Sequence, residues 1–264
     1  MEYFGFCKGI KHLNLPNVSE IELYEGFFAD FYTAADKKLY DLDWYLELGE
    51  QYGKKTLELA CGNGRIMIPM IEKGFDMTGV DLSEYMLELL RAKCGERGVD
   101  PRVFCDDMCK YVTDESYDMV MLINCSICLL DTHEKVERLF DNVCSYLRPG
   151  GVFMLNYFEI PEEGFEDGER QPKYFFNNSK KSFLIFFEKV SSDRTKAVIN
   201  WYGENIDKNG STHRYLTSCT KHVFPKSVIA NVIESRGLNI VREFACKYAP
   251  EGPLVRHMVL QKQL

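Results

Sequence analysis

Two short segments carry residues whose types and spacing could bind a nucleoside-containing ligand. In LELACGNGR, at residues 57–65, Gly62 and Gly64 let the backbone approach a ligand closely and leave free amides where a helix begins. Asp81 closes the apolar segment GVD and could accept two hydrogen bonds from a ribose diol. An acid at the end of an apolar strand needs a polar partner or solvent, because the core offers it neither.

A glycine turn followed by an acid on the next strand also occurs in enzymes that bind nicotinamide dinucleotides. Their GxGxxG fingerprint would require glycine at position 67, which is Met67 here. A nicotinamide-dependent oxidoreductase therefore remains only an alternative.

The elements that position these residues alternate between strands and helices. Short apolar runs predict strands at 56–60, 75–81, 103–104, 117–124 and 152–157, and helical spacing predicts helices at 21–52, 65–73, after the N-cap Ser83, and from an Asp131/Glu134 capping box to the turn at 149–151. This alternation predicts a parallel sheet with helices on both faces. Ligands bind such a sheet beyond the carboxyl ends of its strands. The relevant loops begin near Ala60, Asp81, Asp106 and Asn124.

The pattern changes after residue 160. Runs at 182–190, 196–202 and 214–223 predict an antiparallel β insertion, and a helix at 225–235 precedes two final strands at 238–247 and 254–261. We accordingly expect a core with an N-terminal helical region at 1–160, an insertion at 161–224 that shapes the binding pocket, and core-completing elements at 225–264.

Composition excludes several classes of protein. The chain has 264 residues and a net charge of −8, so it offers no obvious basic surface for nucleic acid. Its longest apolar run, 119–130, is shorter than the roughly 20 residues of a membrane span. The N-terminus has no secretory signal, and the cytoplasm is the expected location. The ten cysteines include the pairs Cys125/Cys128 and Cys105/Cys109, which we interpret as reduced thiols rather than as a metal or redox site.

Four motifs in the expected order resemble class I S-adenosylmethionine-dependent methyltransferases. They are LELACGNGR, GVDLSEYML at 79–87, DDM at 106–108 and YLRPGG at 146–151. The resemblance covers the first 160 residues and the terminal strands. It implies a Rossmann-like, seven-stranded, mostly parallel sheet with an antiparallel last strand, with the β insertion covering the active site, and it implies S-adenosylmethionine as cofactor and S-adenosylhomocysteine as product.

The resemblance also implies roles for individual residues. Ala60, Gly62 and Gly64 would line the methionine part, Asp81 would hold the ribose, Leu82 and Met86 would flank the adenine, Asp107 and the Met108 amide would bind its edge, and Asn124 would lie near the sulfonium. A small-molecule subgroup that includes amino-sugar N-methyltransferases has an arginine near the cofactor carboxylate, where this chain has Arg65. In the same subgroup an N-terminal lid contributes tyrosines, here Tyr24 and Tyr32.

Methyl transfer needs alignment more than acid–base chemistry, so no catalytic residue is required by the sequence. Candidate bases are His133, Tyr157 and His222, with His213 beside them in the insertion. We expect a small-molecule acceptor with a nitrogen or oxygen nucleophile, no nucleic-acid or membrane partner, no metal, and a monomer or homodimer. A protein or nucleic-acid methyltransferase, or a cofactor-binding protein without catalysis, would share the cofactor motifs.

Overall fold

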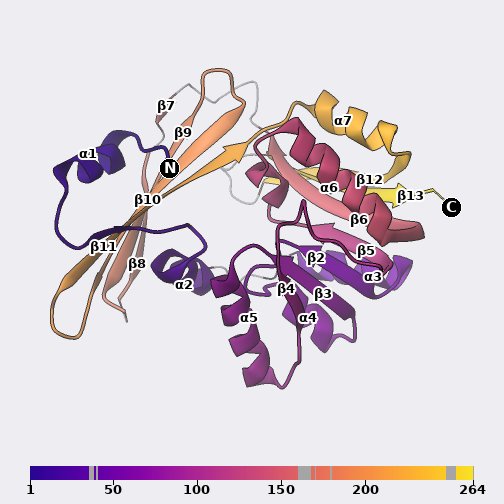
Figure 1. Ribbon diagram of the computed structural model, residues 1–264, viewed down its shortest axis with the longest axis horizontal. Coiled ribbons are helices and arrows are strands. Elements are labelled where there is room, and N and C mark those ends of the chain that lie inside the picture. Colours follow the sequence, from indigo (N-terminus) through magenta and orange to yellow (C-terminus); the bar gives the residue numbers. More distant parts are fainter. Residues whose placement is uncertain are drawn as a thin grey trace. The chain divides into compact units, whose positions relative to one another are not determined.

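The computed structural model describes residues 1–35, 39, 41–159, 168–169, 171–178, 180–247 and 254–263. The chain divides into two compact units (Figure 1). The first comprises Met1–Ala34 and Glu162–Val223, and the second comprises Ala35–Pro161 and Phe224–Leu264. Because residues 160–167 lie outside the described part, the expected start of the insertion at residue 161 is not placed.

The second unit is built on a seven-stranded sheet of order β12-β13-β6-β5-β2-β3-β4. The pairs among β6, β5, β2, β3 and β4 are parallel, whereas β13 runs antiparallel to β6 and to β12. The predicted Rossmann-like sheet with an antiparallel last strand is thus confirmed. Its strands are β2 (Lys55–Leu59), β3 (Asp76–Asp81), β4 (Arg102–Cys105), β5 (Tyr117–Leu122), β6 (Leu147–Glu159), β12 (Leu238–Lys247) and β13 (Leu254–Lys262).

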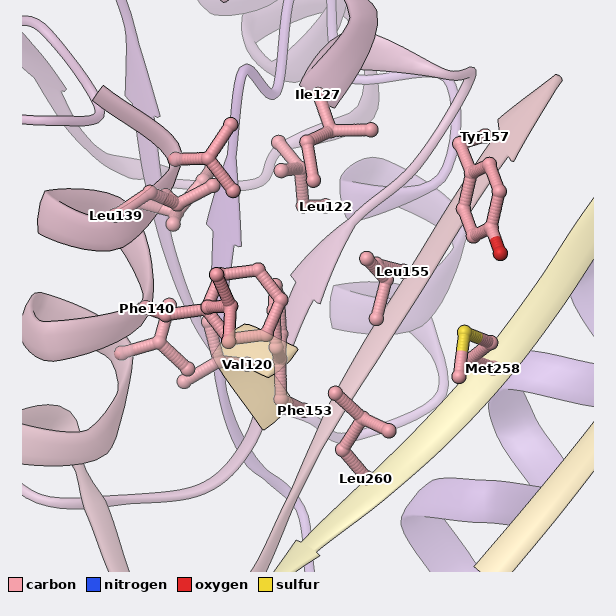
Figure 2. Close-up of a cluster of buried hydrophobic side chains, with 14 of the residues drawn as sticks. Val120, Leu122, Ile127, Leu139, Phe140, Phe153, Leu155, Tyr157, Met258 and Leu260 are labelled. Carbon is pink, nitrogen blue, oxygen red and sulfur yellow. The ribbon is translucent and has the colours of Figure 1, made fainter. Parts of the chain in front are cut away.

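Helices cover both faces of this sheet. On one face α6 (His133–Tyr146), α7 (Lys226–Ser235) and the 3-10 helix η1 (Ser126–Leu129) pack on the cluster that Figure 2 shows, which includes Val120, Phe140 and Phe153. On the other face α3 (Leu42–Tyr52), α4 (Met67–Glu72) and α5 (Glu84–Arg97) pack on methionines such as Met119 and Met121. Both faces of the central strands are therefore buried, which explains why the sequence of β5 is almost continuously apolar.

The first unit is a six-stranded sheet in which all strand pairs but one are antiparallel. It contains β7 (Gly168–Glu169), β8 (Lys173–Asn177), β9 (Ser182–Val190), β10 (Lys196–Ile206) and β11 (Thr212–His222), while β1 (Val18–Glu20) joins β11 in parallel. Helix α1 (Gly5–Leu13) packs with Tyr202 and Leu216, and α2 (Gly26–Ala35) packs with Trp201 and Leu184. The predicted second antiparallel sheet is confirmed, and its placement over the active site stays a prediction.

Several expected element boundaries are wrong. The helical region expected over 21–52 contains two helices, α2 and α3, because α2 begins only at Gly26 and α3 begins at Leu42. The helix after the glycine turn begins at Met67 rather than at Arg65. Thr132, and not Asp131, is the N-cap of α6, since its hydroxyl accepts the Lys135 amide at 3.2 Å. That helix ends at Tyr146, and β6 starts at once and includes the PGG segment.

No helix in the described part of the chain is both long enough and apolar enough to cross a membrane.

Candidate functional site

The loop after β2 is held in a left-handed conformation at three positions. Ala60, Gly62 and Gly64 have φ angles of 54°, 53° and 77°. A Cβ on Gly64 would lie 2.8 Å from Leu90 Cγ on α5, so only glycine fits there. The left-handed conformation of Ala60 costs about 1 kcal/mol, because its Cβ approaches the following carbonyl oxygen. The loop is therefore strained and closely packed at the carboxyl end of the central strand.

Asp81 joins this loop to the start of α5. Its Oδ2 accepts the Gly62 amide at 2.7 Å, and its Oδ1 accepts the Ser83 amide at 2.9 Å. Burial raises the pKa of this carboxyl, and the bonds from the backbone amides of Ser83, Gly62 and Leu82 partly oppose that rise. Each carboxylate oxygen keeps further acceptor capacity for a ligand hydroxyl.

The two residues predicted to flank the adenine differ in exposure. Leu82 follows the acid with 73% of its surface exposed, whereas Met86 is 2% exposed. The Met86 Cε would lie 3.2 Å from a Cβ on Gly62, which places this methionine under the glycine loop. An exposed leucine beside a half-buried acid offers an apolar surface to a flat ring.

Asp107 and Met108 lie in the loop after β4. Asp107 Oδ1 accepts the Cys109 amide at 2.9 Å, an Asx turn that fixes the side chain. The preceding residue is tied to the ribose-binding candidate, since the Asp106 amide donates to the Asp81 carbonyl at 3.0 Å. Met108 is partly buried against the core. The loops after β3 and β4 thus meet at this edge of the sheet.

The loop after β5 contains two successive left-handed residues that are not glycine. Asn124 has a φ of 57° and Cys125 a φ of 56°, which costs of the order of 1 kcal/mol each. Asn156, fully buried on β6, supports the turn by accepting the Cys125 amide at 2.7 Å. The Asn124 side chain is exposed and accepts a hydrogen bond from Arg65 at 3.1 Å.

Arg65 is held by a buried, bidentate ion pair that the sequence did not predict. Its two terminal nitrogens donate to the two oxygens of Asp41 at 2.6 and 2.9 Å, and both side chains are 7% exposed. Tyr45 donates its hydroxyl to Asp41 at 3.0 Å from the first turns of α3. Because Arg65 also reaches Asn124, this cluster connects α3 with the loops after β2 and β5.

Glu58 on β2 is a second acidic residue that motif reasoning did not single out. It is 2% exposed, and its Oε2 has no hydrogen-bond partner among the described residues. Burial raises the pKa of this carboxyl to about 8; Arg65 opposes the rise, and Asp41 and Asp81 add to it. The signal in the sequence was an acid in the middle of the apolar run LELA.

The candidate catalytic residues are not brought together. His133 is exposed at the start of α6, where its ring lies 5.7 Å from that of Phe224. Tyr157 is 4% exposed within the apolar cluster of Figure 2. His222 ends β11 in the first unit, to which Tyr24 and Tyr32 also belong, their rings 6.0 Å apart. The catalytic roles and the contact of these tyrosines with a cofactor stay predictions.

None of the ten cysteines forms a disulfide. Among the described residues, no three histidine, cysteine or acidic side chains lie close enough together to hold a metal ion.

A seven-stranded sheet of this order, with a glycine turn after β2 and an acid closing β3, defines a Rossmann-like methyltransferase fold. Residues 56–151 match a family of methyltransferase domains. The chain is 27% identical over 231 residues to the "Putative methyltransferase YqeM" of Bacillus subtilis (strain 168), covering 83% of this chain and 88% of that protein.

Solved structures share the fold. An S-adenosylmethionine-dependent methyltransferase from Clostridium acetobutylicum superposes with a TM-score of 0.74 at 18% identity, covering 90% of this chain and 98% of the other. The sugar N-methyltransferase KedS8 from Streptoalloteichus gives a TM-score of 0.72 at 17% identity, with 90% and 94% covered.

The chain carries a methyltransferase domain, as the resemblance of its motifs predicts, and the solved structures that share its fold include S-adenosylmethionine-dependent methyltransferases. The match to a methyltransferase domain disfavours the nicotinamide-dependent alternative. The residues present fit such a cofactor: the glycine turn has the left-handed backbone that the motif requires, the Asp81 carboxylate is fixed by backbone amides, and Leu82 is exposed beside it.

The raised pKa of Glu58 predicts a pH dependence of stability. In the unfolded protein this carboxyl has its ordinary pKa of 4.5, whereas in the folded protein it keeps its proton up to about pH 8. The folded state therefore binds more protons in this window, so stability falls as pH rises, by about 1.4 kcal/mol per pH unit. Glu58→Gln is neutral throughout and removes this loss. Between pH 5 and 8 the free energy of unfolding of this variant, measured with urea, should fall by roughly 3 kcal/mol less than that of the wild type.

The matched control is Glu72→Gln, whose carboxylate is 41% exposed and paired with Arg97 on the surface. It should retain the pH slope of the wild type. An equal slope in Glu58→Gln and wild type would show that Glu58 is ionised in the folded protein and would contradict the assignment.

Proposed function

We propose that this protein is an S-adenosylmethionine-dependent methyltransferase, which transfers the methyl group of that cofactor to a nitrogen or oxygen nucleophile of a small molecule. The observation that carries the proposal is the antiparallel sheet of the first unit. This sheet lies outside the matched methyltransferase domain. The superposition with the sugar N-methyltransferase KedS8 nevertheless covers 90% of this chain, so it must include most of the first unit. Likeness in the part outside the shared domain supports a similar class of acceptor.

The charge of the chain favours the same class. A net charge of −8 disfavours binding of a polyanionic nucleic acid. A protein or nucleic-acid acceptor remains the alternative, since it would use the same cofactor residues.

For the cofactor, the loops at the carboxyl ends of β2, β3, β4 and β5 supply the proposed residues. Asp81 would hold the ribose hydroxyls, Leu82 and Met86 would flank the adenine, and Asp107 with the Met108 amide would bind its edge. The turn of Ala60, Gly62 and Gly64, together with Arg65 and Asn124, would hold the amino-acid half. The bonds of Asp81 to Gly62 and Ser83 support this assignment, because they fix the carboxylate before any ligand arrives.

When bound, the cofactor supplies an electrophilic methyl group on a sulfonium. The protein's part is to hold the acceptor in line and to exclude water, since alignment accounts for much of the acceleration in such displacements. An amine must reach the site unprotonated, whereas a hydroxyl needs a base if its proton leaves during attack. His133 is the candidate base that is exposed on the second unit.

Substitution of Asp81 tests the cofactor site. Asp81→Asn keeps a side-chain oxygen but loses the charge and one acceptor, so calorimetry should show S-adenosylhomocysteine binding weakened at least about tenfold, and Asp81→Ala should weaken it further. NADH should bind none of the proteins. Asp76→Asn, at the exposed opposite end of β3, is the control and should bind like wild type. Unchanged binding by Asp81→Ala would refute the site.

An acceptor screen tests the substrate class. Release of S-adenosylhomocysteine would be measured with amino sugars, small amines and hydroxylated aromatics, and in parallel with total transfer RNA and with cell protein from which small molecules have been removed. We expect turnover with a small molecule and none with the polymers. Methylation of RNA or protein alone would overturn the proposal while leaving the cofactor site intact.

A further inference from the structure

The Asp41–Arg65 ion pair is the feature of the second unit that the motifs leave unexplained. Buried ion pairs rarely add net stability, because removing two charges from water costs about as much as their attraction returns. Here the pair has two parallel hydrogen bonds, 7% exposure on each side and a supporting hydroxyl from Tyr45. A bidentate pair of this kind fixes the orientation of the guanidinium plane.

That orientation matters because Arg65 has a third bond. The nitrogen that contacts Asp41 Oδ2 also donates to Asn124 Oδ1 at 3.1 Å. Asn124 begins the strained left-handed turn after β5, and Arg65 directly follows the left-handed turn after β2. The guanidinium therefore connects the two loops, and Asp41 restrains it through two hydrogen bonds while it does so.

The order of strands shows which part of the ligand these loops face. Along the sheet the sequence is β4, β3, β2 and β5. With the ribose at Asp81 on β3 and the adenine toward β4, the amino-acid half of the cofactor falls to the loops after β2 and β5. These are the loops that Arg65 joins.

We propose that Asp41 is a positioning residue of the cofactor site, which acts through Arg65 and Asn124 on recognition of the amino-acid half of the cofactor and not of its adenosine half. The inference rests on the cofactor site assigned above. Asp41 does not itself contact the ligand in this account. Its carboxylate restricts Arg65, and Arg65 in turn holds both loops in the conformation that the ligand meets.

Two ligands separate a positioning role from a structural one. S-adenosylhomocysteine has the amino-acid half, and 5′-methylthioadenosine retains the adenosine and the sulfur but lacks it. Calorimetric affinities for both would be measured with wild type, Asp41→Asn and Arg65→Lys. In each variant we expect S-adenosylhomocysteine to bind at least about tenfold more weakly and 5′-methylthioadenosine to change less than about twofold. Arg65→Lys keeps a charge but cannot bond Asp41 in a bidentate fashion, so it tests the same orientation even if Asp41→Asn fails to fold.

The matched control is Asp141→Asn. Asp141 on α6 also forms a two-contact pair with an arginine, Arg236, at 3.0 and 3.3 Å, but with a 61% exposed side chain in a different part of the unit. It should bind both ligands like wild type.

Two results would overturn the inference. Equal weakening of both ligands would mean that the pair only maintains the fold, and no weakening would mean that Arg65 needs no positioning. Asp81→Ala distinguishes these from failure of the site itself. If it weakens both ligands, the cofactor site stands whatever Asp41 does, and if it weakens neither, the assignment of the site is wrong.

Discussion

The central strands of the large sheet are covered by helices on both faces, and this burial constrains everything polar in the second unit. Side chains of β2, β5 and β6 can reach neither water nor a polar partner along most of their length. Groups able to bind a ligand must therefore gather where the parallel strands end. At that edge the fold accepts left-handed residues, a buried ion pair, and a Glu58 oxygen that has no hydrogen-bond partner in the described part of the chain. Strain of this kind concentrates at functional sites.

Hydrogen bonds between loops make this edge a single site. Asp81 bonds the loop after β2 through Gly62, and its carbonyl bonds the loop after β4 through Asp106. Arg65 adds the loop after β5 through Asn124. Four loops that are far apart in the sequence are thus fixed relative to one another by hydrogen bonds, and this preorganisation supports the proposed cofactor site.

The sequence predicted the elements whose signals are local. Clean alternation or continuous apolar runs placed β3, β5, β9 and β13, and the glycine turn with Asp81 predicted where the strands end. What it could not predict depends on tertiary contacts. Asp41 and Arg65 are 24 positions apart, and no periodicity relates them. Strand β1 has only three residues, and it is a strand because it pairs in parallel with the edge of β11. The sequence could not decide between Asp131 and Thr132 as the N-cap of α6, because threonine and aspartate both suit that position.

A crystal structure of the protein with S-adenosylhomocysteine is the most direct test of the account. We expect both ribose hydroxyls within hydrogen-bond distance of the Asp81 carboxylate, the amino-acid half over the loops after β2 and β5, and the bidentate pair of Asp41 and Arg65 intact. A ligand whose ribose lies away from Asp81, or an Arg65 that has left Asp41, would contradict it.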